Sequence, residues 1–166
     1  EAGLPEGLFQ VVVGDGPTLG SAIINHANFV MFTGSTETGK IVAEQCGRRL
    51  IGFSAELGGK NPMIVLDDAP LERAVQGAIT ASFSNAGQLC MSIERMYIQD
   101  GIWDEFVPRL TAEVEKLRLG SAFDFSYDVG ALISQEQLDK VQAHMNDARD
   151  HGASVLAGGR HRPDIA

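Results

Sequence analysis

Apolar runs alternate with helical patterns along this chain. Runs typical of buried strands occur at 9–13, 28–32, 50–57, 62–66 and 96–99, and a further strand begins at 154–156. Amphipathic or helix-forming stretches lie between them, at about 17–26, 36–49, 71–84, 103–117 and 135–150. Strand–helix–strand order favours parallel strands joined by right-handed crossovers. The pattern therefore predicts an α/β fold.

Turn and capping residues predict where the helices begin. Gly14–Pro17 reads as a turn that leads into the first helix. Ser35 or Thr36 can cap the second helix, because a side-chain oxygen at the N-cap accepts a free backbone N–H. A third helix is expected to start after Asp68 as a capping acid, with Pro70 as an early proline.

Two features bear on the organisation of the chain. Gly58-Gly59 interrupts an extended segment and is the best candidate for a domain boundary, although nothing there resembles a flexible linker. The chain starts at Glu1 without methionine and stops at Ala166 soon after a glycine-rich turn. We therefore expect an internal piece of a longer protein.

Composition narrows the class of protein. Hydrophobic residues make up 44% and charged residues 21%, as in ordinary globular proteins. The formal net charge is 13 − 22 = −9, which would repel phosphate backbones, so we expect no nucleic-acid partner. No apolar stretch approaches the roughly 20 residues that span a bilayer, and the N-terminus lacks a secretory signal. A soluble cytoplasmic protein without a membrane partner is expected.

The two cysteines occupy different contexts, and we expect both to be reduced. Cys46 lies within a predicted helix, where a packing role is favoured. Cys90 follows a helix and the loop Asn85–Gln88, so its thiol can be exposed and act as a nucleophile when ionised. The alternative for Cys90 is a buried apolar side chain.

Glycines and hydroxyls mark two candidate sites for a phosphate-bearing ligand. Gly14, Gly16 and Gly20 follow the first predicted strand, but G-x-G-x-x-x-G is not the usual dinucleotide fingerprint. An ordinary turn, with a helix packed tightly through Gly20, is the alternative. In the segment 32–39, strand, glycine, hydroxyls and helix start follow in succession, which favours an anion at the helix N-terminus. Simple helix capping explains that segment equally well.

Other polar residues remain ambiguous at this level. Glu56 ends an apolar strand beside two glycines, where it is either a general base or a solvated charge, and Lys60 carries the same ambiguity. The four histidines show no metal-ligand spacing, so no metal is expected; they are His26, His144, His151 and His161. We expect a core stripe made of Trp103, Phe106, Leu110 and Leu117.

Taken in order, the motifs resemble the aldehyde dehydrogenase superfamily over nearly the whole chain. The matching segments are L-P-E-G at 4–7, V-V-V-G at 11–14, F-T-G-S-T at 32–36, E-L-G-G-K-N-P at 56–62, G-Q-L-C at 87–90, and Arg95. Thirty-four positions separate Glu56 from Cys90, which is also similar to the family. Several ordered motifs are more specific than any one of them.

The resemblance implies a Rossmann-like parallel sheet followed by the start of an α/β catalytic domain. Residues 1–57 would be the C-terminal part of the dinucleotide-binding domain, and 58–166 the N-terminal part of the catalytic domain. Cys90 would be the nucleophile and Glu56 the base that activates water. The cofactor NAD or NADP would lie against Gly16, Gly20, Phe32, Thr33, Gly34, Ser35, Thr36 and Leu57. Full-length members are homo-oligomers, and the oxyanion-binding asparagine belongs to an upstream motif.

Within the family, the run 54–68 and L-R-L-G at 117–120 look similar to bacterial succinate-semialdehyde dehydrogenases. The resemblance thus implies oxidation of a small aldehyde, succinate semialdehyde, to its acid through a cysteine thioester. Two alternatives stay open. One is a CoA-acylating aldehyde dehydrogenase, against which Glu56 argues. The other is an inactive structural or binding fragment, since the isolated chain lacks much of the expected site.

Overall fold

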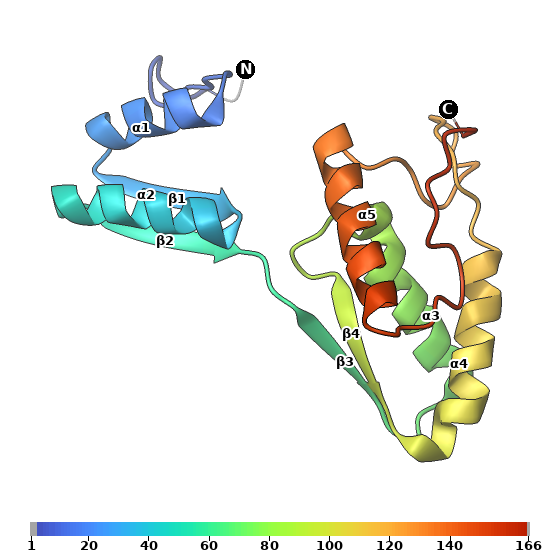
Figure 1. Cartoon of the computed structure of the whole chain (residues 1–166). Helices are drawn as coiled ribbons and strands as arrows, with labels where there is room; N and C mark the ends of the chain where they lie inside the picture. Colours follow the sequence, from blue (N-terminus) through green and yellow to red (C-terminus); the bar gives the residue numbers. More distant parts are fainter. Residues whose placement is uncertain (1–2, 166) are drawn as a thin grey trace. The chain divides into compact units, whose positions relative to one another are not determined.

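A computed structural model describes residues 3–165, and the chain divides into two compact units, Glu1–Gly58 and Gly59–Ala166. Figure 1 shows their elements. The first unit contains α1 (Gly16–His26), β1 (Phe29–Gly34), α2 (Thr36–Arg49) and β2 (Gly52–Leu57). The second contains β3 (Asn61–Val65), α3 (Leu71–Phe83), the 3₁₀ turn η1 (Ser84–Gly87), β4 (Ile93–Ile98), α4 (Asp100–Glu115) and α5 (Gln135–Asp150). The predicted α/β class is confirmed.

In the first unit, β1 and β2 are parallel, with α2 as the crossover between them. The register pairs Phe29 with Gly52 and Gly34 with Leu57, so both strands end at the same edge. Cys46 of α2 is 1% exposed, which confirms the expected packing role. This small unit places the ends of two strands and the start of α2 close together.

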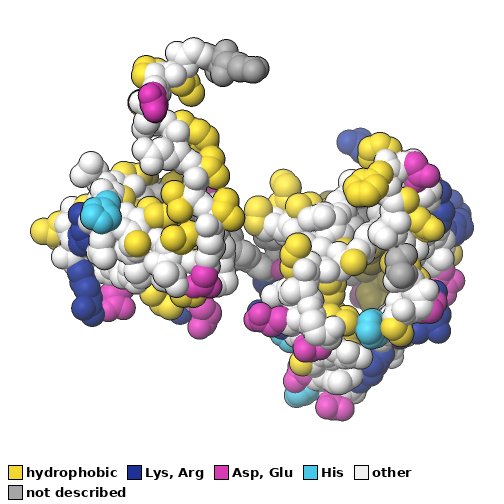
Figure 2. All heavy atoms as spheres, turned by 90° about the horizontal axis from the view of Figure 1, so that it is seen from above, with side chains coloured by type: hydrophobic (Ala, Val, Ile, Leu, Met, Phe, Trp, Pro, Cys, Tyr) yellow, Lys and Arg dark blue, Asp and Glu magenta, His cyan; other side chains and the backbone are white. Residues whose placement is uncertain are grey.

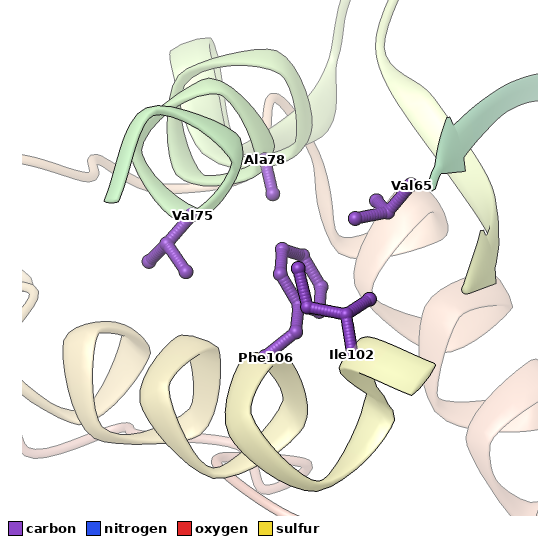
Figure 3. Close-up of a cluster of buried hydrophobic side chains, with 5 residues drawn as sticks. All are labelled: Val65, Val75, Ala78, Ile102 and Phe106. Carbon is purple, nitrogen blue, oxygen red and sulfur yellow. The ribbon is translucent and has the colours of Figure 1, made fainter. Parts of the chain in front are cut away.

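In the second unit, β3 and β4 are parallel, with α3 as the crossover. The core is a cluster of five buried side chains from β3, α3 and α4, drawn in Figure 3: Val65, Val75, Ala78, Ile102 and Phe106. Phe106 has no exposed surface, and burying such a ring contributes about 3 kcal/mol. The core fixes α3 and β4, between which the Cys90 loop runs.

Two predicted strands are absent. Residues 9–13 have no strand hydrogen bonds, and Val13 is 91% exposed. Residues 154–156 are likewise irregular. A strand needs a paired neighbour, and each sheet in the described part of the chain has two strands, β1–β2 and β3–β4. Both runs are apolar, but among the described residues no partner strand lies beside them.

Two local predictions in the second unit were wrong. Pro70, not Asp68, is the N-cap residue of α3, and no side chain bonds there, because Asp68 lies two residues upstream of the cap. Trp103 is 49% exposed, whereas Ile102 and Phe106 are buried. Ile102, four residues before Phe106, takes the buried place on that helix face, although Trp103, three residues before Phe106, has a spacing that also fits it.

Both units carry exposed apolar side chains, as Figure 2 shows for one face. The most exposed of them include Phe9, Val13, Leu50, Phe123, Phe125 and Ile133. Among residues 3–165, no helix is long and apolar enough to cross a bilayer.

Candidate active site

The loop that carries Cys90 begins with a run of left-handed backbone. Asn85, Ala86 and Gly87 have φ values of 52°, 57° and 74°. A left-handed non-glycine residue costs roughly 1–2 kcal/mol, so neighbouring contacts must hold this conformation. A Cβ on Gly87 would lie 3.3 Å from the Ser82 carbonyl oxygen, which favours glycine there. The turn ends α3 sharply and leaves the thiol of Cys90 exposed.

The half-buried side chain of Gln88 holds this loop from one side. Its Nε2 donates to the carbonyl oxygens of Asn85 at 3.0 Å and Ala131 at 3.3 Å. Its Oε1 accepts the backbone N–H of Ile133 at 2.8 Å. One amide thus joins the Cys90 loop to a segment more than 40 residues later in the sequence.

Asn61, at the start of β3, holds the loop from the other side. Its Nδ2 donates to the carbonyl oxygen of Cys90 at 2.7 Å and to that of Ser92 at 2.9 Å. The N–H of Ser92 closes the turn by donating to the Leu89 carbonyl oxygen at 3.1 Å. The backbone on both sides of Met91 is therefore fixed, while the thiol remains accessible.

The charged residues beside the loop are bonded to partners within the second unit. Lys60 forms an ion pair with Glu94, and Arg95 donates two hydrogen bonds to the Lys60 carbonyl oxygen, at 3.1 and 2.8 Å. The guanidinium of Arg95 also lies 5.9 Å from the ring centroid of Tyr97. The exposed Lys60–Glu94 pair contributes at most about 1 kcal/mol. Lys60 is therefore a partner of Glu94 within the second unit.

Glu56 lies in the first unit, near the end of β2, where it pairs with Thr33 of β1. Leu57 pairs with Gly34 in the same register. Both Glu56 and Leu57 are exposed. The structure thus brings Glu56, Leu57, Thr33 and Gly34 together at the carboxyl ends of two parallel strands, where α/β sheets bind ligands.

The same edge holds the N-terminus of α2. Ser35 is the capping residue: its Oγ accepts the Thr38 N–H at 3.1 Å and donates to Thr38 Oγ1 at 2.9 Å. Thr36 is the first helical residue. The backbone N–H groups of the first helical turn point out of the helix N-terminus, where the positive end of the helix dipole also lies. Both features favour the binding of a phosphate oxygen.

Glycines shape the remaining surface of the first unit. A Cβ on Gly16 or Gly20 would meet nothing within 4 Å, so Gly20 does not provide the tight helix packing considered as an alternative. A Cβ on Gly34 would come within 2.5 Å of the Phe32 ring, which therefore lies against Gly34. Gly39 was not singled out from the sequence; a Cβ there would lie 2.7 Å from Leu57 Cδ2. The available signal in the sequence was a glycine within the predicted helix at 36–49.

The residues predicted for the site thus fall into two groups. Glu56 and the cofactor candidates lie in the first unit, and Cys90 lies in the second, so the meeting of Glu56 with Cys90 stays a prediction. Sequence reasoning missed Asn61 and Gln88 as supports of the loop, although both stand inside motifs that were recognised. In the described part of the chain, no three histidine, cysteine or acidic side chains are grouped to hold a metal.

Comparison with known proteins places these motifs in a family. The model of the aldehyde dehydrogenase family matches residues 1–165. A putative succinate-semialdehyde dehydrogenase [NADP(+)] of Mycolicibacterium smegmatis is 55% identical over 165 residues, covering 99% of this chain and 32% of that protein. Succinate-semialdehyde dehydrogenase [NADP(+)] GabD of Escherichia coli is 42% identical, covering 96% and 33%.

Solved structures with a similar fold lead to the same family. An NADP-dependent enzyme of E. coli superposes with a TM-score of 0.93 at 40% identity, covering 98% of this chain and 34% of that one. Betaine aldehyde dehydrogenase of Staphylococcus aureus in complex with NAD⁺ gives 0.92 at 35% identity, covering 98% and 33%. The chain spans about a third of the length of these relatives. Its motifs, fold and relatives show that the chain belongs to the aldehyde dehydrogenase family.

Proposed function

We propose that this protein oxidises an aldehyde to its carboxylic acid with NAD or NADP, and that Cys90 is the nucleophile. The observation that carries the proposal is an exposed thiol on a loop whose backbone is held from two sides by amide side chains. A reactive group works best when its geometry is fixed before the substrate arrives. Cys46, by contrast, is buried within α2.

The first step is attack by the Cys90 thiolate on the aldehyde carbon. A bond forms between Sγ and that carbon, and the electron pair of the carbonyl moves to its oxygen. The oxyanion needs hydrogen-bond donors, for which the backbone N–H of Cys90 is the candidate in this chain. The Leu89 carbonyl oxygen, which shares a peptide plane with the Cys90 N–H, accepts the Ser92 N–H at 3.1 Å, so this plane has a set orientation.

The cofactor residues are proposed at the edge of the first unit. The start of α2, with Gly34, Ser35 and Thr36, would hold the phosphates, and the open space at Gly16 and Gly20 admits close approach. Leu57, at the end of β2, would face the nicotinamide. A bound nicotinamide would supply the hydride acceptor, and loss of hydride from the carbon attached to Cys90 Sγ would leave a thioester.

Release of the product requires water and a base. Glu56 takes a proton from a water molecule, whose oxygen attacks the thioester carbon. The carbon–sulfur bond then breaks, so that the acid leaves and the Cys90 thiolate is restored. Glu56 suits this role because it is exposed at the end of β2, beside the residues proposed to hold the cofactor.

For the substrate we propose succinate semialdehyde. The support comes from the relatives at 55% and 42% identity, which carry that name together with NADP. The chain's own run from Ser54 to Asp68 points the same way. The isolated 166-residue chain is expected to show negligible turnover, because it spans about a third of those relatives.

The test compares two cysteines in the protein that the complete reading frame encodes. Cys90→Ala should lower kcat for aldehyde-dependent NADPH formation by about 10³-fold or more, since no nucleophile remains. Cys46→Ala removes the buried thiol and should keep most of the activity. Retained dehydrogenase activity in Cys90→Ala would contradict the proposal.

A further inference from the structure

The amide of Asn61 contacts the nucleophile's own peptide group. Its nitrogen donates to the carbonyl oxygens of Cys90 and Ser92, at 2.7 and 2.9 Å. An asparagine amide has two N–H donors, so these bonds use its full donor capacity. The two acceptors stand on either side of Met91, and one side chain therefore spans the turn that presents the thiol.

The backbone around Asn61 is arranged to place this amide. Asn61 pairs with Ile93 and Pro62 pairs with Arg95, so the register shifts by one residue, with Glu94 as the extra one. Such bulges re-aim side chains at the ends of strands. Pro62 has no N–H to give to the ladder. The side chain of Asn61 therefore supplies donors at the point where the regular β3–β4 ladder stops.

Neighbouring residues keep the amide in this orientation. A Cβ on Gly59 would lie 3.1 Å from Asn61 Oδ1, so the absence of a side chain there leaves room for the amide. Arg95 of β4 donates to the carbonyl oxygen of Lys60, the residue just before Asn61, and so ties the start of β3 to β4. Asn61 is also half-buried, where a carbonyl left without its donor costs more than it does in water.

We infer that Asn61 is a positioning residue for Cys90: by binding both carbonyls that flank Met91, it fixes the turn from which the thiol attacks. The inference rests on the proposed function for its catalytic consequence. It goes beyond that function in naming the group that sets the geometry of the nucleophile. Asn61 touches neither aldehyde nor cofactor in this account and acts through the backbone of Cys90.

The sharpest variant is Asn61→Asp, which keeps the size of the side chain and places a carboxylate oxygen against two carbonyl oxygens. In the protein of the complete reading frame, kcat should fall by about tenfold or more, while KM for the aldehyde changes by less than about threefold. Asn146→Asp, the same charge change on the exposed surface of α5, should leave both constants unchanged. A loss of the same size in Asn146→Asp would overturn the inference.

A second readout does not depend on turnover. In the protein of the complete reading frame, without substrate, the rate of Cys90 alkylation by iodoacetamide should differ from wild type by more than about threefold in Asn61→Asp, since a loosened turn changes the presentation of the thiol. The buried Cys46 serves as an internal reference. If the wild-type protein lacks dehydrogenase activity but this rate still changes, the proposed function fails and the positioning role stands.

Stability is measured alongside, by thermal unfolding followed through circular dichroism. Asn61→Ser, which is shorter and uncharged, replaces Asn61→Asp if that variant does not fold, and should change kcat and alkylation in the same sense. The inference is overturned if a folded Asn61 variant keeps both kcat and the Cys90 alkylation rate within about threefold of wild type.

Discussion

The helix start at Ser35 and the loop at Cys90 are both turns next to a parallel strand, but they are held in different ways. Ser35 is bonded to Thr38, three residues along the chain. The Cys90 loop is held by Asn61 from 29 residues before it, and through Gln88 by Ile133 from 45 residues after that glutamine. The first turn is a local structure, whereas the second depends on the folded second unit.

This difference predicts how each turn responds to change. Loss of one bond at Ser35 should weaken the start of a helix that is otherwise held along its length. Loss of one amide at the Cys90 loop leaves several polar groups without partners and frees a backbone that already contains left-handed residues. The second turn should therefore be the more sensitive.

Among changes to the two turns, Gln88→Leu is expected to have the largest effect on stability. The variant removes three hydrogen bonds, to Asn85, Ala131 and Ile133, at nearly the same side-chain volume. The loss of three hydrogen bonds, each of which contributes about 0.5–1.5 kcal/mol net, should destabilise the second unit by about 1–3 kcal/mol and lower kcat. Chemical unfolding and steady-state kinetics measure the two effects. The control Gln142→Leu changes an exposed residue of α5, and a comparable loss there would remove the distinction between loop and surface.

A smaller effect is expected for Ser35→Ala. It removes the cap of α2 and should cost about 1 kcal/mol of stability in the first unit. Ser35→Gly should cost a few tenths of a kcal/mol. Thr36→Ala, one residue further, makes no capping change and is the matched control. Circular dichroism during urea unfolding can rank the three variants, and equal losses at both positions would argue against Ser35 as the cap.

The smallest effect on stability is expected from a fall in pH, which acts on the segment that leads to Ala131. The side chain of Arg118 donates to both carboxylate oxygens of Asp128, and its backbone N–H adds a third bond. These bonds lower the pKa of Asp128 from 3.8 to about 2. The pair's stabilisation is therefore present above pH 3.8 and is lost as the pH falls toward 2.

Hydrogen exchange checks this effect. Protection of the Asp128 and Val129 amides, which donate to the Arg118 carbonyl oxygen, should fall between pH 4 and pH 2 in wild type. In Asp128→Asn, protection should already be low at pH 5 and change little on acidification. An identical acid profile in both proteins would show that another group controls this segment.

The comparison also explains what the sequence could predict. A cap at Ser35 or Thr36, the alternation of strands and helices and the parallel pairing follow from local chemistry. All three are confirmed, with Ser35 as the cap. The apolar runs at 9–13 and 154–156 failed as strands because an apolar run does not reveal whether a neighbouring strand is present. Trp103 failed as a core residue because Trp103 and Ile102, at three and four residues before Phe106, both fit its helix face, and the spacing does not show which of them is buried.

Within the candidate site, the sequence motifs identified Glu56 and Cys90, but not the side chains that hold the Cys90 loop. Glu56 and Cys90 stand in recognisable runs, and their roles remain predictions that the chemistry of exposed carboxylate and thiol supports. The tethers made by Asn61 and Gln88 join segments far apart in the chain. Such pairings arise from the register of β3 and β4 and from the path of the backbone after α4, which no local pattern contains.

The central claim is that Cys90 carries the acyl group and Glu56 releases it. The most direct measurement uses Glu56→Gln in the protein of the complete reading frame, mixed with succinate semialdehyde and NADP and followed by absorbance and peptide mass analysis. The account predicts a burst of about one NADPH per active site, then near arrest, with a succinyl thioester on the peptide that contains Cys90. Continued turnover at the wild-type rate, or an acyl group on any residue other than Cys90, would contradict it.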